Sequence, residues 1–292
     1  MRLAHAHNAH SIFSSNCWKY TSVTTVIRGG RSQEPGTLGV SRVFGLLREL
    51  ASHNREGMRM TDIARRLRIE PPTAHRILKC LVEERVLSRD KGTKHYHLGP
   101  LVFELGIVAT PKVDIRPLCE PSIDRIARET GDVVFLTRRS DRDAVCLSRK
   151  DGRFPVKTFT LEVGMRRPLG VGAGSLAILS ALPDPEIQDI VRANADRLEE
   201  YDGLTAAGLL SQVRRTQKQK YAVRDLRGLG GVRTVGVAIH ADDGTPFAAL
   251  SLSAIRSRMK EKRVGELAAL LKYEASRVEK KLVGAQILAW EI

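Results

Sequence analysis

The sequence predicts an α+β protein of two domains: an N-terminal winged helix–turn–helix and a larger C-terminal domain with helices packed on an antiparallel sheet. Three observations support this prediction. Two short amphipathic helices with a tight turn between them fit residues 60–86, and a basic hairpin follows directly. Beyond residue 114, strand-like runs lie between helical ones. The length of 292 residues suits two domains.

The first two helices of the N-terminal domain are predicted from the spacing of their apolar residues. A helix from Val40 should pack beneath the others through Val40, Val43, Phe44, Leu47 and Leu50. The next helix is expected to begin at Thr61, a good N-cap residue. Its inward side chains would be Ile63, Ala64 and Leu67, and its outward ones Arg65, Arg66 and Arg68.

The third helix has two faces of different character. Its apolar stripe comprises Ala74, Ile77, Leu78, Leu81 and Val82, and Pro72 suits its first turn. Its other face carries Thr73, His75, Arg76 and Lys79, which can all bond a base edge or a phosphate. This pattern alone also fits an ordinary helical hairpin with a solvated charged face.

A basic hairpin after the third helix favours the DNA-binding interpretation. Two strand-like runs, 86–89 and 95–98, flank a Gly-centred turn at 90–94. Helix, turn, helix and hairpin in this order make a winged helix–turn–helix, whose second helix fits the major groove. The expected DNA contacts are Thr61, Thr73, His75, Arg76 and Lys79 on the helices and Lys91 and Lys94 on the wing.

The charge and the cysteines limit the classes of function. The formal net charge is +15, and between Gly36 and Pro100 thirteen basic residues face seven acidic ones, which points to a polyanionic partner. The four cysteines are far apart and lack any metal-ligand spacing, so we expect no disulfide, metal or cofactor. A reducing cytoplasm fits, and no run of about 18 apolar residues could span a membrane.

Residues 1–35 differ from the rest of the chain. They are rich in Ser, Thr and His and poor in acids, and they lack the continuous apolar core of a secretory signal. We expect a disordered basic arm here, followed by the winged domain at 36–99.

The segment 100–113 is predicted to be a linker helix that Pro111 ends. Its strongly apolar residues are Leu101, Val102, Leu105, Ile107 and Val108. An apolar stripe on a linker needs a cover, and a second subunit is the natural one.

The second domain is predicted at 114–292. A helix closed by Gly131 should open it, and strands are expected at 132–138, 144–149, 154–163, 232–239 and 247–253. Helices are expected at about 184–198, at 205–219 with Thr205 as cap, and in a long C-terminal run over 264–282. This order is typical of an α+β sensor domain.

The most glycine-dense stretch, PLGVGAGS at 168–175, runs straight into a helix. It lacks the Lys of a Walker loop and the third Gly of a dinucleotide fingerprint. Backbone N–H groups at a helix N-terminus favour an anion such as a carboxylate. Alternatively, the glycines only permit close helix–sheet packing, and the residues alone leave both interpretations open.

Over residues 38–285 the chain resembles the IclR family of bacterial transcription regulators. Three motifs carry the resemblance: DIARRLRIEPPTAHRILKCLVEERVL, RRPLGVGAGSLAILSALPD and GVRTVGVAIHADDGTPFAALSLS. The resemblance implies a GAF-like C-terminal domain that binds a small organic effector, expected to be a carboxylate, aromatic or not. It also implies homodimers or homotetramers that bind palindromic operators.

The resemblance also implies residues for the effector site. The effector carboxylate would meet the backbone amides of Gly172 and Ala173, and two strand serines would be Ser251 and Ser253. The apolar walls would come from Met165, Leu169 and Val232. Some members of the family have an acid near the position of Arg224, so an arginine facing the pocket would favour a more acidic ligand.

Two rival functions remain open at this point. One is a GAF-like redox enzyme, although neither Cys119 nor Cys146 has a partner at a suggestive spacing. The other is a DNA-binding protein that no longer senses a ligand because its own side chains fill the pocket. The effector, the operator and the sign of regulation are not encoded in any motif.

Overall fold

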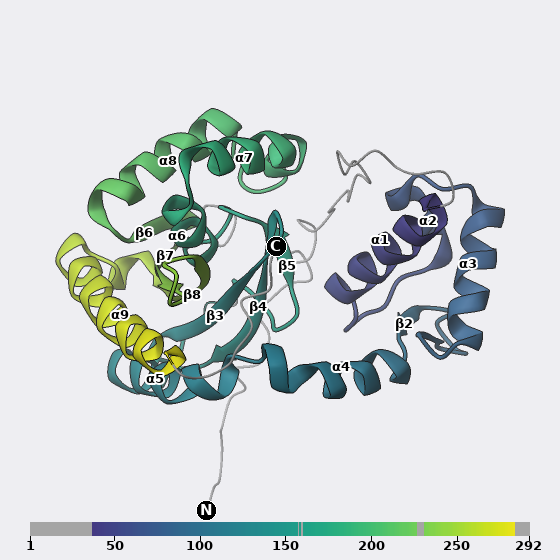
Figure 1. The fold of residues 1–292 in the computed structure, drawn as a ribbon, viewed down its shortest axis with the longest axis horizontal. Coiled ribbons are helices and arrows are strands. Elements are labelled where there is room, and N and C mark those ends of the chain that lie inside the picture. The colour runs from purple at the N-terminus through teal and green to yellow at the C-terminus, as the bar shows by residue number, and fades with distance from the viewer. Residues whose placement is uncertain (1–36, 157, 159, 227–230, 284–292) are drawn as a thin grey trace, which may run out of the picture.

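The computed structural model describes residues 37–283 except 157, 159 and 227–230. A small N-terminal domain and a larger sheet-containing domain are joined by one helix, α4 (Figure 1). The predicted fold class is confirmed, since a helix–turn–helix domain precedes a domain of helices and antiparallel sheet. The predicted arm at 1–35 lies outside the described residues.

The N-terminal domain is a winged helix–turn–helix. Its elements are α1 (Leu38–Ser52), α2 (Met60–Leu67), α3 (Pro71–Glu83), β1 (Leu87–Arg89) and β2 (Tyr96–Leu98). The two strands pair antiparallel to form the wing. Its small core includes Leu50, Ile63, Leu78 and Tyr96, so each element contributes apolar surface to the same cluster.

Several details of this domain differ from the prediction. Val40 and Phe44 are exposed, because the buried face of α1 is centred on Leu46 and Leu50. Helix α2 begins at Met60 with Arg59 as N-cap, so Thr61 is an exposed second residue and not the cap.

Arg66 was also predicted wrongly, as a solvent-facing residue. Its Nη1 lies 2.7 Å from Oε1 of Glu49, a carboxylate that is buried in the core of the domain. A buried carboxylate needs a charged partner, and this requirement turns the arginine inward.

The linker helix α4 (Pro100–Val113) begins at Pro100, which suits the first helical position. It continues through Pro111, which therefore does not end it. Phe103, Leu105, Ile107 and Val108 are 55–80 % exposed. Such a row of exposed apolar side chains is unusual for a monomer.

The C-terminal domain is built on one six-stranded antiparallel sheet. The strands are β3 (Val133–Ser140), β4 (Asp143–Lys150), β5 (Arg166–Pro168), β6 (Ala222–Leu226), β7 (Val232–His240) and β8 (Pro246–Ile255). Their order across the sheet is β5-β4-β3-β8-β7-β6. The central strands β3, β8 and β7 are almost wholly buried, because helices cover both faces.

The two faces of the sheet have separate apolar cores. Helices α5 (Arg116–Thr130) and α9 (Glu261–Leu282) pack on one face through a large aliphatic cluster. Helices α6 (Ala173–Ala181), α7 (Asp184–Leu198) and α8 (Ala206–Gln219) cover the other face. Figure 1 shows the sheet between these two helical layers. The α6 face is the one that carries Ser251 and Ser253.

Most elements of this domain match the prediction. Gly131 ends α5 with a left-handed backbone, and Thr205 caps α8 by accepting a hydrogen bond from the Gly208 N–H at 3.1 Å. The strand predicted at 154–163 is wrong, because no strand occurs among the described residues of that segment. The short edge strands β5 and β6 were not predicted.

Candidate functional sites

The outer face of α3 presents the predicted DNA contacts to solvent. His75, Arg76 and Lys79 are exposed and Thr73 is half-buried, while Ala74, Leu78 and Leu81 hold the helix in the core. Lys79 Nζ lies 3.8 Å from Glu83 Oε1, so this lysine already has a weak partner on its own helix. The face is thus polar and basic, as the interpretation of a recognition helix requires.

The wing is a short hairpin whose tip is held by Asp90. The Oδ1 atom of Asp90 accepts hydrogen bonds from the Thr93 backbone N–H at 2.6 Å and from the Thr93 hydroxyl at 2.8 Å. The bond from the Thr93 N–H is the main cause that lowers the pKa of Asp90. Lys91 and Lys94 are exposed on either side of this turn. The fixed turn therefore places two cations at the end of the wing.

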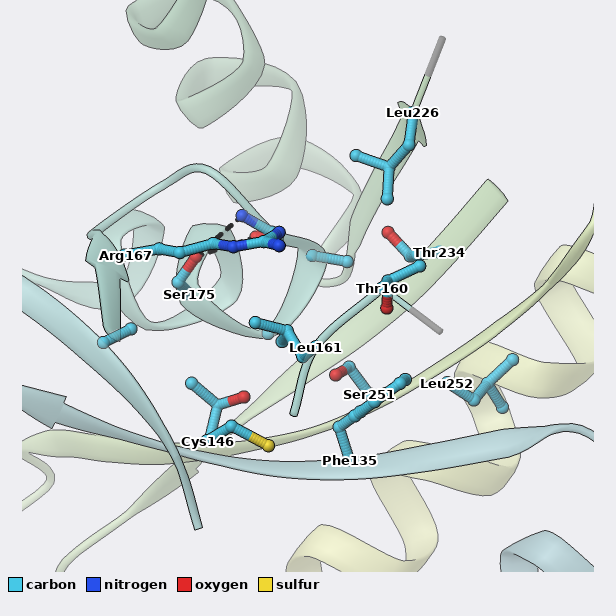
Figure 2. Close-up of a pocket in the computed structure, with 15 residues that line it drawn as sticks. Phe135, Cys146, Thr160, Leu161, Arg167, Ser175, Leu226, Thr234, Ser251 and Leu252 are labelled. Carbon is cyan, nitrogen blue, oxygen red and sulfur yellow. Dashed lines mark hydrogen bonds between the residues drawn. The ribbon is translucent and has the colours of Figure 1, made fainter. Parts of the chain in front are cut away.

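A small cavity of about 30 Å³ lies between the sheet and the first turn of α6. Figure 2 shows the residues that line it, which come from all six strands of the sheet, from the start of α6 and from the segment after β4. Three of the residues predicted for the effector site line it: Gly172, Ala173 and Ser251. Its lining contains no aspartate or glutamate.

The start of α6 is packed tightly against the sheet. Gly236 on β7 lies so close that a Cβ there would be 2.6 Å from the carbonyl carbon of Ala173. Ser175 Oγ accepts a hydrogen bond from the Gly172 N–H at 2.9 Å, so that amide is already engaged. The donors left at the helix end are the N–H groups of Ala173, Gly174 and Ser175, which no carbonyl of the helix can reach.

The two predicted serines have different surroundings. Ser251 lines the cavity and is 5 % exposed. Ser253 is buried on the same face, but its Oγ lies 2.6 Å from Oγ1 of Thr158 and does not line the cavity. The segment that follows β4 therefore already occupies the position where Ser253 was expected to hold a ligand.

The other predicted effector residues also lie away from the cavity lining. Leu169 is fully buried in the core beneath α6, Val232 is buried at the start of β7, and Met165 is half-buried before β5. Arg224 on β6 donates a hydrogen bond to Oε1 of Gln212. It lines a second, more open cavity of about 400 Å³ beside α8.

Several residues of the cavity were missed by the sequence analysis. They are Phe135, Thr137, Cys146, Thr160, Leu161, Arg167 and Thr234. Thr137 on β3 and Cys146 on β4 point to the same face of the sheet, but their place in the strand pattern shows only which face they share. Arg167 stands beside the glycine-rich motif, and a cation beside a predicted helix N-terminus was the one signal that could have found it.

The buried cysteines are poor nucleophiles. Desolvation raises the pKa of Cys119 and of Cys146 to about 12 each. A neutral thiol at neutral pH is unreactive. Within the described residues, no group of three His, Cys, Asp or Glu side chains is placed to bind a metal ion. No helix in the described part of the chain is long and apolar enough to cross a bilayer.

A winged helix–turn–helix joined to a separate sheet domain with a small internal cavity is the architecture of a transcriptional regulator with a ligand-binding domain. The comparisons with known proteins name the family. Residues 108–280 match the model of the bacterial transcriptional regulator IclR C-terminal domain, and residues 39–91 match the IclR helix–turn–helix domain. The chain belongs to the IclR family.

Characterised relatives agree with this assignment. The chain is 26 % identical to the HTH-type transcriptional regulator KipR of Bacillus subtilis over 72 % of this chain and 84 % of KipR. It is 25 % identical to the transcriptional repressor AllR of Salmonella typhi, with 82 % and 90 % of the two chains covered.

Solved structures share the fold. A regulator of this family from Silicibacter has a TM-score of 0.72 at 20 % identity, covering 84 % of this chain and 96 % of that one. A homologue from Microbacterium hydrocarbonoxydans, solved with 4-hydroxybenzoate, has a TM-score of 0.65 at 19 % identity and covers 84 % and 99 %.

Proposed function

We propose that this chain is an effector-responsive transcriptional regulator of the cytoplasm. It binds operator DNA as a homodimer through α3 and the wing. A small carboxylate bound in the cavity at the start of α6 sets its affinity for the operator. The observation that carries the proposal is the cavity at the N-terminus of α6, whose mainly apolar lining includes hydroxyl groups and one arginine but no acid.

The chemistry of this cavity suits a carboxylate. The Ala173 and Gly174 amides and the Ser251 hydroxyl can donate to its oxygens, and the positive end of α6 contributes about 0.3–1 kcal/mol or more when partly buried. The relative solved with 4-hydroxybenzoate supports a carboxylate as the type of ligand.

The DNA contacts divide into two kinds. His75, Arg76 and Thr73 face outward from α3 toward base edges, whereas Lys91 and Lys94 reach phosphates from the wing. Lys79 and Thr61 lie at the margins of this surface. Pairing of two chains through the exposed apolar side of α4 would place two recognition helices about 34–36 Å apart, or a multiple of this distance.

The test of the proposal compares two variants that remove one donor each. Ala173→Pro deletes one N–H at the first position of α6, where the extended Gly172 backbone (φ −101°, ψ 166°) already accommodates a following proline. Ser251→Ala deletes a hydroxyl. Both variants should bind the operator as tightly as the parent when no ligand is present. An acid that changes the operator affinity of the parent should leave that of the variants unchanged. If calorimetry finds that both bind that acid as tightly as the parent, the site lies elsewhere.

One rival function has an observation in its favour. The cavity volume of about 30 Å³ holds little more than a water molecule, as a DNA-binding protein without a sensor would have. On the proposed function, a ligand enters by displacing the segment that carries Thr160 and Leu161. If no acid alters the operator affinity of the parent, the rival is correct. The redox-enzyme alternative has no support, since the thiol of Cys146 is protonated and buried.

A further inference from the structure

Two side chains in the cavity wall have polar atoms without a partner. Thr137 on β3 is 3 % exposed, and its Oγ1 makes no hydrogen bond within the described residues. The Nε of Arg167 on β5 is likewise enclosed and unbonded within that part of the chain. A buried polar atom left unpaired costs free energy, so each needs a physical reason.

Both groups converge on the first turn of α6. A Cβ built on Gly174 would lie 3.1 Å from Ser251 Oγ and 3.3 Å from Thr137 Oγ1, so only a glycine there leaves room between the two hydroxyls. Figure 2 shows Arg167 extended across the cavity beside Ser175, with Ser251 on the sheet below. The cavity thus has a cationic end and a hydroxyl-lined floor.

The charge at the cationic end is only weakly balanced by the protein, through the more distant charge of Asp202. No ion pair joins Arg167 to an acid among the described residues, and its guanidinium lies instead over the ring of Tyr201, with Cζ 5.8 Å from the centroid. Burial lowers the pKa of Arg167. A guanidinium beside the positive end of a helix is an unfavourable pair, and a bound anion relieves it.

We infer that Arg167 and Thr137 determine which acid this cavity accepts. Arg167 and the amides at the start of α6 bind the carboxylate, while Thr137 and Ser251 hold a second oxygen of the same molecule. The ligand is therefore a small hydroxy acid. This inference rests on the proposed function and adds the chemical class of the effector and two specificity-determining residues.

The test uses pairs of acids that differ by one hydroxyl: glycolate and acetate, lactate and propionate, malate and succinate. Calorimetry on the full chain should show a preference of about tenfold or more for the hydroxy acid of at least one pair, because a site built around a hydroxyl rejects the analogue without it. Thr137→Val should remove this preference, because it should weaken the binding of the hydroxy acid alone. Arg167→Met should weaken the binding of both acids of the pair.

Two further variants are the matched controls. Ser180→Ala removes a buried hydroxyl of α6 outside the cavity, which donates to the Leu176 carbonyl at 2.7 Å. Arg166→Met removes the neighbouring arginine, which pairs with Asp143 at 3.3 Å. Both should lower the melting temperature of the ligand-free protein and keep the preference between the two acids.

The melting temperatures of the ligand-free variants give a second readout. If Thr137 and Arg167 had a purely structural role, their replacement would lower the melting temperature. Since Thr137→Val and Arg167→Met each remove an unsatisfied group, their melting temperatures should equal or exceed that of the parent. Lower values for both would overturn the inference. The inference would also be overturned if Thr137→Val lost affinity equally for the two acids of a pair, although the proposed function would then stand. If no acid of the panel binds the parent, the inference fails.

Discussion

Cys119 and Cys146 offer the simplest check on the chemistry of single residues. Both are buried, with their pKa raised to about 12, whereas Cys80 is exposed on α3. Only the thiolate reacts with iodoacetamide, and at pH 7 a thiol of that pKa is ionised in about one molecule in 10⁵. We therefore expect peptide mapping of the native protein to find Cys80 labelled at pH 7 and the two buried thiols unmodified.

The pH dependence of this labelling has a definite sign. Because desolvation disfavours the thiolate, the reactivity of Cys146 should rise only as the pH approaches 12, as long as the fold survives. Labelling of Cys146 at pH 7 as fast as Cys80 would contradict this account and revive the enzyme alternative.

Arg76 and Lys94 should differ in their effects on DNA binding. If Arg76 makes a bidentate contact with a base, Arg76→Ala costs about 1–3 kcal/mol on the operator and relaxes sequence preference. Lys94→Ala should weaken operator and random duplexes alike and reduce the slope of affinity against salt. Fluorescence anisotropy on both duplexes at several salt concentrations measures this. Equal effects of the two substitutions on both duplexes would refute the division between base and phosphate contacts.

The sequence indicated some of these residues and not others, for a physical reason. His75, Arg76 and Lys79 could be predicted because a helix period separates an outer face from a buried one. Thr137 could not, because the groups that meet it come from distant strands and from α6, whereas Arg167 was indicated only by its place beside the glycine-rich motif. The resemblance to a family indicated Ser251, but it could not show that Thr158 already engages Ser253.

The segment 154–163 shows how an element can be misread. Its alternation of apolar and polar residues predicted a strand. The structure has no regular alternation here: Thr158 and Thr160 are buried, whereas Val156, which would share their face in a strand, and Val163 are more than half exposed. The threonines turn inward because Thr158 bonds Ser253 and Thr160 lines the cavity. An apparent period of two therefore does not by itself establish a strand.

The exposed apolar side of the linker helix α4 is the proposed contact between two chains. Leu105 is 60 % exposed, so Leu105→Glu should leave the fold of one chain intact and place a charge in the proposed interface. Sedimentation velocity should show the variant as a monomer, with weakened binding to the operator. Val156→Glu, another exposed apolar position at 53 %, is the control and should sediment like the parent. A Leu105→Glu dimer with full operator affinity would rule out α4 as the contact.

The molecule as a whole places its two candidate sites in different domains. The recognition helix and the wing lie in the N-terminal domain, while the cavity lies beyond α4 in the sheet domain (Figure 1). The order of the elements and the two-domain division could be predicted from periodicity and turn residues. The edge strands β5 and β6 could not, because three to five residues carry too little pattern. A ligand can act across these domains only through the free-energy difference of its binding to two states.

Reciprocal binding measurements test the central claim, that an acid in the cavity sets the affinity for DNA. The affinity for an operator duplex is measured with and without a saturating acid, and the affinity for the acid with and without saturating duplex. Because the coupling free energy is shared by both ligands, the two ratios should be equal, at about 5–150-fold. Ser251→Ala should bring both ratios to one. The claim would be contradicted if calorimetry showed that the acid binds the parent but not Ser251→Ala, and the acid nevertheless left the operator affinity of the parent unchanged.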